Sequence, residues 1–223
     1  MDDTETLIKA LAQEGGAVRR FPSPLRVVGH WAGVAVGGIV LFVTMMGMRP
    51  DLLDCLTHPR FVFDLAAALS TAAGAAWAAA VSALPGRPPW QRVLPAVPAA
   101  VWVASLLLGA LTDQAPLRAD LICLPVVAGL AVIPCTVLVL AMRKGEVLAP
   151  CQGGFLAVAA SASLAYAGLR LVHPVDAGRM MLVWQFGPVA LLSAMAACFG
   201  EWLFPRKTPE FLRIYIAAGK DGA

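Results

Sequence analysis

Charged side chains are scarce in this sequence. Asp, Glu, Lys and Arg make up 14% of the residues, whereas soluble domains carry roughly 25%. Hydrophobic residues make up 59%, and the mean hydropathy is +0.75. The few charges stand in short clusters between long apolar runs. This composition excludes an ordinary soluble domain and predicts an all-α membrane protein with short polar tails.

Motifs of soluble enzymes and of nucleic-acid-binding proteins are also missing. The sequence has no Gly-rich phosphate loop, no Ser nucleophile elbow and no pair of catalytic carboxylates. The net charge is only +3, and no basic run is interleaved with aromatic residues. The five cysteines include no C-x-x-C pair, which argues against a zinc ribbon or a thioredoxin-type site. We therefore expect no catalysis, no resident cofactor and no direct contact with nucleic acid.

Six apolar segments meet or approach the roughly 20 residues that a helix needs to cross a bilayer. They cover residues 27–48, 61–83, 92–111, 121–142, 152–171 and 180–204. Turn-forming sequences separate them, for example Arg49-Pro50-Asp51 and His173-Pro174. The first run is too long for a cleaved signal peptide, which favours an anchor. The sequence thus predicts a cytoplasmic tail (1–25), a transmembrane domain (26–205) and a second cytoplasmic tail (206–223).

Basic residues are distributed unequally between the two sides of the predicted bundle. One side holds Lys9, Arg19, Arg20, Arg26, Arg87, Arg92, Arg143, Lys144, Arg206, Lys207, Arg213 and Lys220. The other side holds Arg49, Arg60, Arg118, Arg170 and Arg179. Because cytoplasmic loops retain positive charge, this distribution predicts that both termini are cytoplasmic.

The amino-terminal tail has the pattern of a short amphipathic helix. Leu7, Ile8 and Leu11 share one face, and Gly15-Gly16 ends the pattern. About a dozen residues are marginal as an isolated helix, so this helix needs a partner surface. The opposite face is mixed and begins with acidic residues, whereas membrane-surface helices have a basic polar face. The pattern therefore favours a protein partner over the bilayer for Leu7, Ile8 and Leu11.

The interiors of the spans carry few polar groups. No charged residue lies near the middle of any span, which weighs against an ion-coupled transporter. Asp64 lies one turn inside the second span, and we expect it to form an interfacial pair with Arg60. Prolines at 95, 98, 125 and 134 are expected to bend the third and fourth spans.

Residues capable of metal binding or redox chemistry collect on the predicted outer side. Thiolate, imidazole and carboxylate groups together suit a soft or borderline metal ion. The candidates are Cys55, His58, Cys123, His173 and Asp176. Their spacing matches no known metal motif, so Cys123 can equally be a small apolar residue at a helix end, and His173 a turn residue.

Several different short motifs follow one another along the chain. They are Thr-Glu-Thr-Leu-Ile-Lys-Ala-Leu (4–11), Ala-Val-Arg-Arg-Phe-Pro-Ser-Pro (17–24), Arg49-Pro50-Asp51-Leu52, Pro59-Arg60-Phe61, Leu84-Pro85-Gly86-Arg87, Cys123-Leu124 and Leu182-Val183-Trp184. With the six spans, they resemble the NrsF-like family of bacterial membrane anti-sigma factors. That family holds an extracytoplasmic-function (ECF) sigma factor at the inner membrane. The likeness extends over almost the whole chain.

The resemblance implies roles for particular residues. It implies that the tail, through Leu7, Ile8 and Leu11, contacts the sigma factor and releases it on an envelope signal. Two outer cysteines are associated with sensing in the family, and Cys123 stands at the first position. This chain has His173 where the family has the second cysteine, before a proline. A Cys123 and His173 metal site, with a metal ion as the signal, or a Cys55 and Cys123 pair would replace the thiol pair.

Three other functions remain as alternatives. A small membrane transporter or channel would need intramembrane charge or a broken helix with a polar lining, and only the prolines support it. A membrane enzyme using Cys123 or His173 lacks an acid, a base or a cofactor constellation. A purely structural role is the last alternative.

Overall fold

The computed structural model describes Glu5 and residues 22–84, 86–113, 116–145, 147–174 and 177–205. Within this part of the chain the structure is helical and has no strand. Six helical segments are long and apolar enough to cross a membrane: Pro24–Met46, Pro59–Ser82, Pro89–Thr112, Cys123–Met142, Pro150–Arg170 and Gly178–Cys198. The predicted all-α class and the presence of six helices able to cross a membrane are confirmed. The predicted tail helix with Leu7, Ile8 and Leu11, and the tail 206–223, lie outside the described residues.

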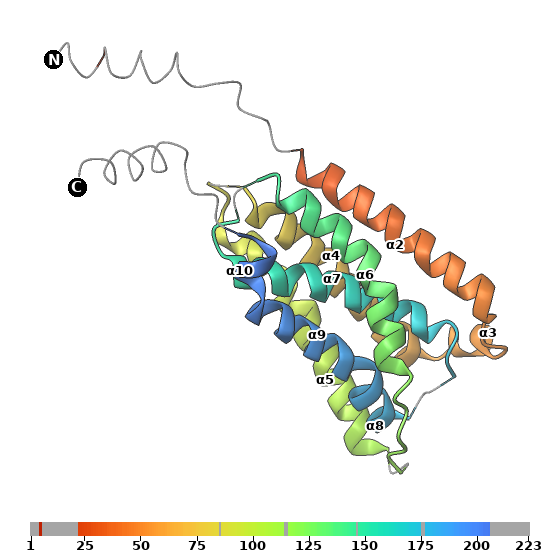
Figure 1. The fold of residues 1–223 in the computed structure, drawn as a ribbon. Helices are drawn as coiled ribbons and strands as arrows, with labels where there is room; N and C mark the ends of the chain where they lie inside the picture. Colours follow the sequence, from red (N-terminus) through yellow and green to blue (C-terminus); the bar gives the residue numbers. More distant parts are fainter. Residues whose placement is uncertain are drawn as a thin grey trace, which may run out of the picture.

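The helices follow the predicted order with short connections (Figure 1). They are α2 (Pro24–Met46), α3 (Leu52–Cys55), α4 (Pro59–Ser82), α5 (Ala96–Thr112), α6 (Cys123–Met142), α7 (Pro150–Arg170), α8 (Gly178–Met180), α9 (Gly187–Cys198) and α10 (Gly200–Leu203). A 3-10 turn (Pro89–Arg92) precedes α5, and a π-helical turn (Met181–Phe186) joins α8 to α9. Three long helices begin with proline, whose fixed φ suits the first helical position.

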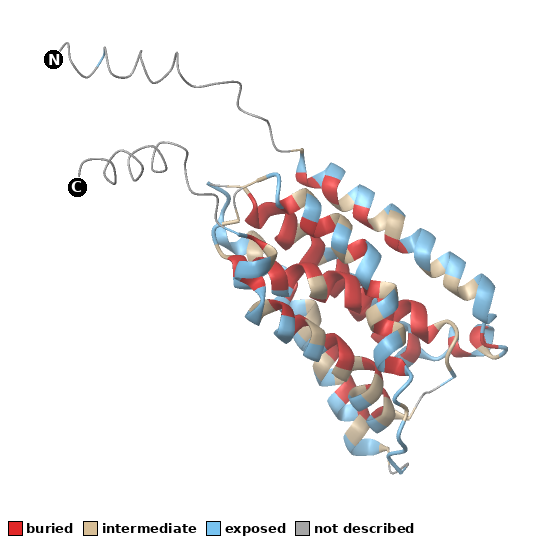
Figure 2. Cartoon of the chain, viewed as in Figure 1, coloured by how far each residue is buried: buried red, intermediate tan, exposed pale blue. Residues whose placement is uncertain are grey.

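Helix α7 lies in the centre of the bundle and packs against α4, α6 and α9 (Figure 2). Of the residues in its most apolar 18-residue stretch, 83% are buried inside the protein, compared with 17% for α2. Helix α7 is rich in Ala, Gly and Ser, and α4 is rich in Ala, so neighbouring backbones can approach closely. In α4, residues such as Ala68, Ala75 and Ala79 are fully buried against these neighbours.

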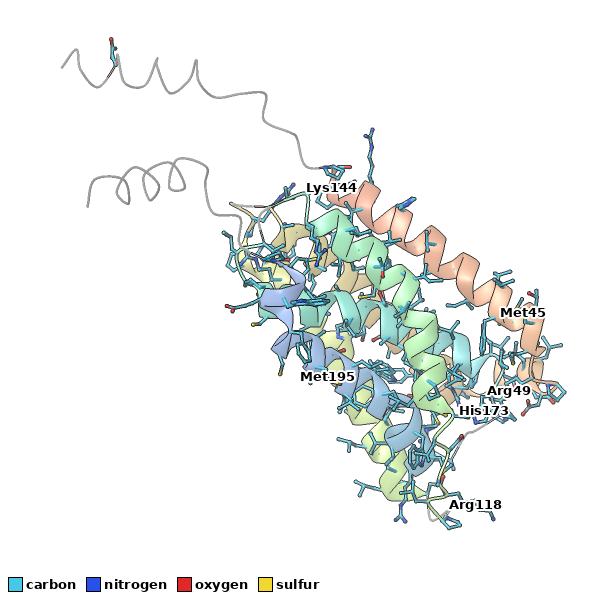
Figure 3. All side chains as sticks on the ribbon, viewed as in Figure 1. Met45, Arg49, Arg118, Lys144, His173 and Met195 are labelled. Atoms are coloured by element: carbon cyan, nitrogen blue, oxygen red, sulfur yellow. The ribbon has the colours of Figure 1, made fainter. Side chains whose placement is uncertain are left out.

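The bundle has two ends, which we call the Lys144 end and the Arg170 end after a residue that lies at each. At the Lys144 end, α2 begins and α10 lies, so the first and last described helices reach the same end (Figures 1 and 3). Arg143 Nε donates a hydrogen bond of 2.6 Å to the Leu203 carbonyl at this end. At the Arg170 end lie α3, α8, Arg118 and His173 (Figure 3). Which end faces the cytoplasm stays a prediction.

Two expectations about the spans need correction. Pro95 caps the start of α5 instead of bending the third span, and Pro134 is the proline inside α6. The sixth span is not one regular helix, because the π-helical turn interrupts it. The turn buries the Gln185 side chain completely, and neither of its amide atoms has a hydrogen-bond partner among the described residues.

Asp64 is also placed differently from the expected interfacial pair. Its side chain is buried in the bundle, and Ser105 on α5 donates a hydrogen bond of 2.6 Å to Asp64 Oδ1. The Arg60 guanidinium lies instead in the space left by the missing side chain of Gly109. Among the described residues no ion pair joins Arg60 to Asp64, because the bundle offers each a closer neighbour on α5.

Candidate functional site

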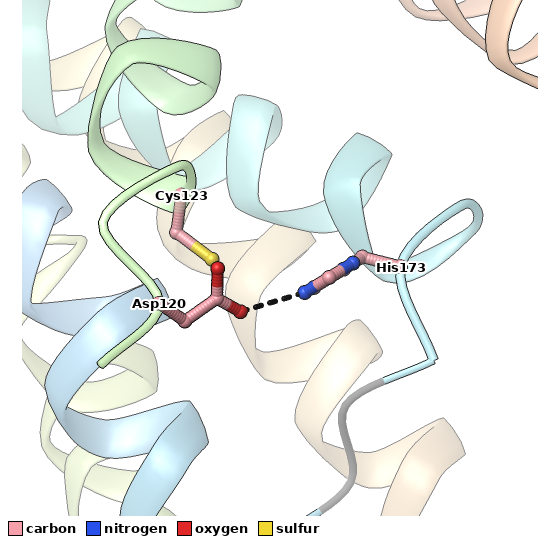
Figure 4. Close-up of side chains that lie close together, drawn as sticks. All are labelled: Asp120, Cys123 and His173. Atoms are coloured by element: carbon pink, nitrogen blue, oxygen red, sulfur yellow. Dashed lines mark hydrogen bonds and ion pairs between the residues drawn. The ribbon is translucent and has the colours of Figure 1, made fainter. Parts of the chain in front are cut away.

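Three candidate ligand groups converge at the Arg170 end of the bundle. Cys123 is the first residue of α6, and Asp120 precedes it by less than one helical turn. His173 follows the end of α7, where its backbone N–H donates a 2.8 Å hydrogen bond to the Leu169 carbonyl. The bond closes the carboxyl end of α7 and holds His173 facing the start of α6 (Figure 4). Two adjacent helix ends therefore position the three side chains.

The geometry of the site brings a thiol, an imidazole and a carboxylate together. His173 Nε2 lies 2.8 Å from Asp120 Oδ2. The ligand atoms of Asp120, Cys123 and His173 all lie within 4.8 Å of one another (Figure 4). The Cys123 side chain is buried, whereas Asp120 and His173 are partly open to the surroundings. We call these three residues the triad.

The triad has the composition of a binding site for a borderline divalent metal ion. Zinc-type ions take Cys, His and Asp ligands at about 2.0–2.3 Å, which places the ligand atoms roughly 3.3–3.8 Å apart in a tetrahedron. Inward movements on the order of 1 Å would produce this arrangement, leaving the fourth position for water or substrate. Reactive cysteines, by contrast, occupy electropositive, partly exposed settings. Cys123 is buried beside a carboxylate, so the setting favours metal binding over thiol oxidation.

Cys55 belongs to a different part of the structure from Cys123. It packs with Leu52 and Phe61, whereas Cys123 belongs to a separate core cluster with Trp102 and Tyr166. No disulfide joins the two cysteines in the described structure, and they lie in these separate clusters. A sensing role for the predicted Cys55 and Cys123 pair stays a prediction.

The remaining sequence candidates lie apart from the triad or outside the described residues. His58 lines a neighbouring cavity of about 620 Å³ together with Asp54, Cys55 and the buried Asp64 and Arg170. In the same loop, the Arg49 guanidinium holds the pKa of Asp51 well below its usual range, through hydrogen bonds of 2.8 Å. Asp176 lies outside the described residues.

Asp120 is the member of the triad that sequence reasoning missed. A signal for it exists, because the spacing Asp120-x-x-Cys123 brings both residues within one turn at a helix start. Free cysteines within apolar spans usually pack as small core residues, but Cys198 is exposed on the bundle surface and Cys135 is only partly buried.

The fold and the triad define a class: helical proteins able to span a membrane, with a potential ligand site at one end. The chain belongs to the NrsF family, described as negative regulator of sigma F, whose profile matches residues 11–205. No curated protein and no solved structure matches the chain. The protein is therefore a negative regulator of a sigma factor, and its family is not one of enzymes.

Proposed function

We propose that this protein is an anti-sigma factor of the bacterial inner membrane that holds an ECF sigma factor inactive until an envelope signal arrives. Membership of a family of negative sigma regulators carries the proposal, since such a protein needs a sigma factor as its partner. Six helices able to cross a bilayer support retention of that partner at the membrane. A sigma factor held there is separated from its promoters.

The amino-terminal tail is the proposed sigma-binding segment. Leu7, Ile8 and Leu11 form an apolar face that a helix of this length cannot leave in water. A groove on the sigma factor would bury this face in the helix-in-groove mode. The family profile begins at residue 11, so Leu7 and Ile8 precede the matched region.

The triad is the proposed signal input. A borderline metal ion, arriving at the Arg170 end, binds more tightly to the state in which Asp120, Cys123 and His173 are drawn together. An ion can shift the balance between two states only by this difference in affinity. A 10⁴-fold shift requires about 5.5 kcal/mol of differential binding. Helices α6 and α7 pack along each other and run to the Lys144 end, where the tail joins the bundle.

Substitutions in the tail test the proposed sigma contact. Burying one leucine side chain is worth roughly 1.5–3 kcal/mol, so Leu7→Asp or Leu11→Asp should release the sigma factor from the membrane. The measurement is co-purification of the factor with membranes that contain the full-length protein. Gln13→Asp, which adds the same charge on the opposite helix face, is the matched control and should retain the factor. Retention by both leucine variants would show that another surface binds it.

A further inference from the structure

A second cavity lies at the opposite end of the bundle from the triad. It has a volume of about 300 Å³ and lies between α2 and the end of α6. Its lining residues are Pro22, Arg26, Val27, His30, Val137, Leu140, Ala141 and Lys144. We call it the α2–α6 groove.

The ionisable side chains that line the α2–α6 groove are all basic. Arg26 and His30 stand one turn apart on α2, and Lys144 follows the end of α6. All three are exposed, and no described carboxylate pairs with any of them. Figure 3 places Lys144 beside the start of α2, far from Arg118 and His173. The groove therefore brings together basic side chains whose charge no described carboxylate neutralises.

The wall of the groove is apolar. Val27, Val137, Leu140 and Ala141 form it, and Val27 belongs to the buried core that α2 shares with α6. Helix α2 as a whole is strongly apolar, with a mean hydropathy of 1.9 over its most apolar 18 residues, and only 17% of these residues are buried by protein. A ligand that fills this groove must carry an anionic group at one end and an apolar chain at the other.

We propose that the α2–α6 groove binds an anionic phospholipid, with its phosphate among Arg26, His30 and Lys144 and an acyl chain along the apolar wall. Basic pockets between transmembrane helices are suited to such headgroups. A free phosphate ion would leave the apolar wall unused, and an acidic peptide would compete with lipid that already surrounds α2. The proposal goes beyond sigma-factor regulation and does not depend on it.

The site has a structural consequence for the amino-terminal tail. Pro22 lines the groove and α2 begins at Pro24, so the bound headgroup contacts the point where the chain enters the bundle. The lipid would hold the start of α2 against α6 at a fixed depth. The position at which the tail leaves the membrane surface is then set by a lipid contact as well as by protein packing.

The test uses the full-length protein in nanodiscs of equal parts phosphatidylglycerol and phosphatidylcholine, with retained lipid measured by native mass spectrometry. We expect the wild type to retain phosphatidylglycerol selectively. Arg26→Gln/Lys144→Gln should weaken retention on the order of 30-fold, because each basic side chain near a membrane surface contributes about a fivefold change in binding. The conservative pair Arg26→Lys/Lys144→Arg should keep most of the retention, which separates loss of charge from loss of folding.

Arg87→Gln/Arg118→Gln removes the same charge from exposed positions outside the groove and is the matched control. Equal retention of the two lipids by the wild type would overturn the proposal. Equal losses in the control and the groove variant would also overturn it, because the effect would then be general surface charge. Complete displacement of the lipid by millimolar inorganic phosphate would show that the groove recognises a free anion instead.

Discussion

The hydrogen bond between His173 and Asp120 decides how an ion can enter the triad. Nε2 of His173 and Oδ2 of Asp120 lie 2.8 Å apart and form one hydrogen bond. An ion that takes both atoms as ligands must displace this bond and the Cys123 thiol proton. Metal binding and proton release are therefore coupled, so affinity should rise with pH.

We predict that Cys123→Ser and His173→Gln each weaken metal binding by more than the 10–100-fold that is typical of outer-shell partners, since each removes a direct ligand. The measurement is a Co²⁺ titration of the purified protein in detergent, in which a thiolate ligand gives a charge-transfer absorption band. In cells, Cys123→Ser should lock the regulator in one signalling state.

Cys151→Ser is the matched control for the metal titration. Cys151 is an exposed free thiol at the start of α7, at the opposite end of that helix from His173. This variant should bind Co²⁺ like the wild type. Unchanged binding and a normal stimulus response by Cys123→Ser would show that Cys123 is only a packing residue.

Helix α7 is the element on which the rest of the bundle assembles. Small residues let α9 approach so closely that a Cβ added at Gly154 would lie 2.5 Å from the Ala196 carbonyl oxygen. Backbone atoms cannot yield as a flexible side chain can, so any side chain at Gly154 must push α9 away. The sixth span, with its π-helical turn, depends on that contact.

For the packing of α7 against α9, we predict that Gly154→Ala lowers the free energy of unfolding by roughly 1–3 kcal/mol, the usual cost of overpacking. The measurement is denaturant unfolding in detergent followed by tryptophan fluorescence. Gly33→Ala is the matched control, because no atom outside the neighbouring backbone of its own helix lies within 4 Å of the added Cβ. It should be neutral or stabilising by up to about 1 kcal/mol, as alanine is the better helix former. A Gly154→Ala variant as stable as the control would refute close α7 and α9 packing.

The described part of the chain forms six helical segments able to cross a membrane, and its first and last described helices reach the same end of the bundle (Figure 1). Both termini should therefore face one side of the membrane. The excess of Lys and Arg near that end predicts that the side is the cytoplasm. The predicted arrangement puts the α2–α6 groove inside and the triad outside.

For the membrane topology, we predict that a reporter active only in the periplasm is inactive when fused after Ala223. The same reporter should be active when inserted within residues 115–118, which connect α5 and α6. A cytoplasmic reporter at the same two positions provides the complementary readout. Periplasmic activity at the carboxyl terminus would overturn the topology and place the triad on the cytoplasmic side.

The helical class, the six helices able to cross a membrane and the family could be predicted from the sequence, because apolar length and short motifs are local properties of a chain. Cys123 and His173 were also predicted as candidates, although their sensing role stays a prediction. The neighbours of these residues could not be predicted, because they depend on tertiary packing. Asp120 joins them, Asp64 pairs with Ser105 instead of Arg60, and Gln185 is buried in a π-helical turn. These contacts depend on which helix faces pack together. The pattern of apolar residues does not predict those faces in a membrane protein, because lipid and neighbouring helices are equally apolar surroundings.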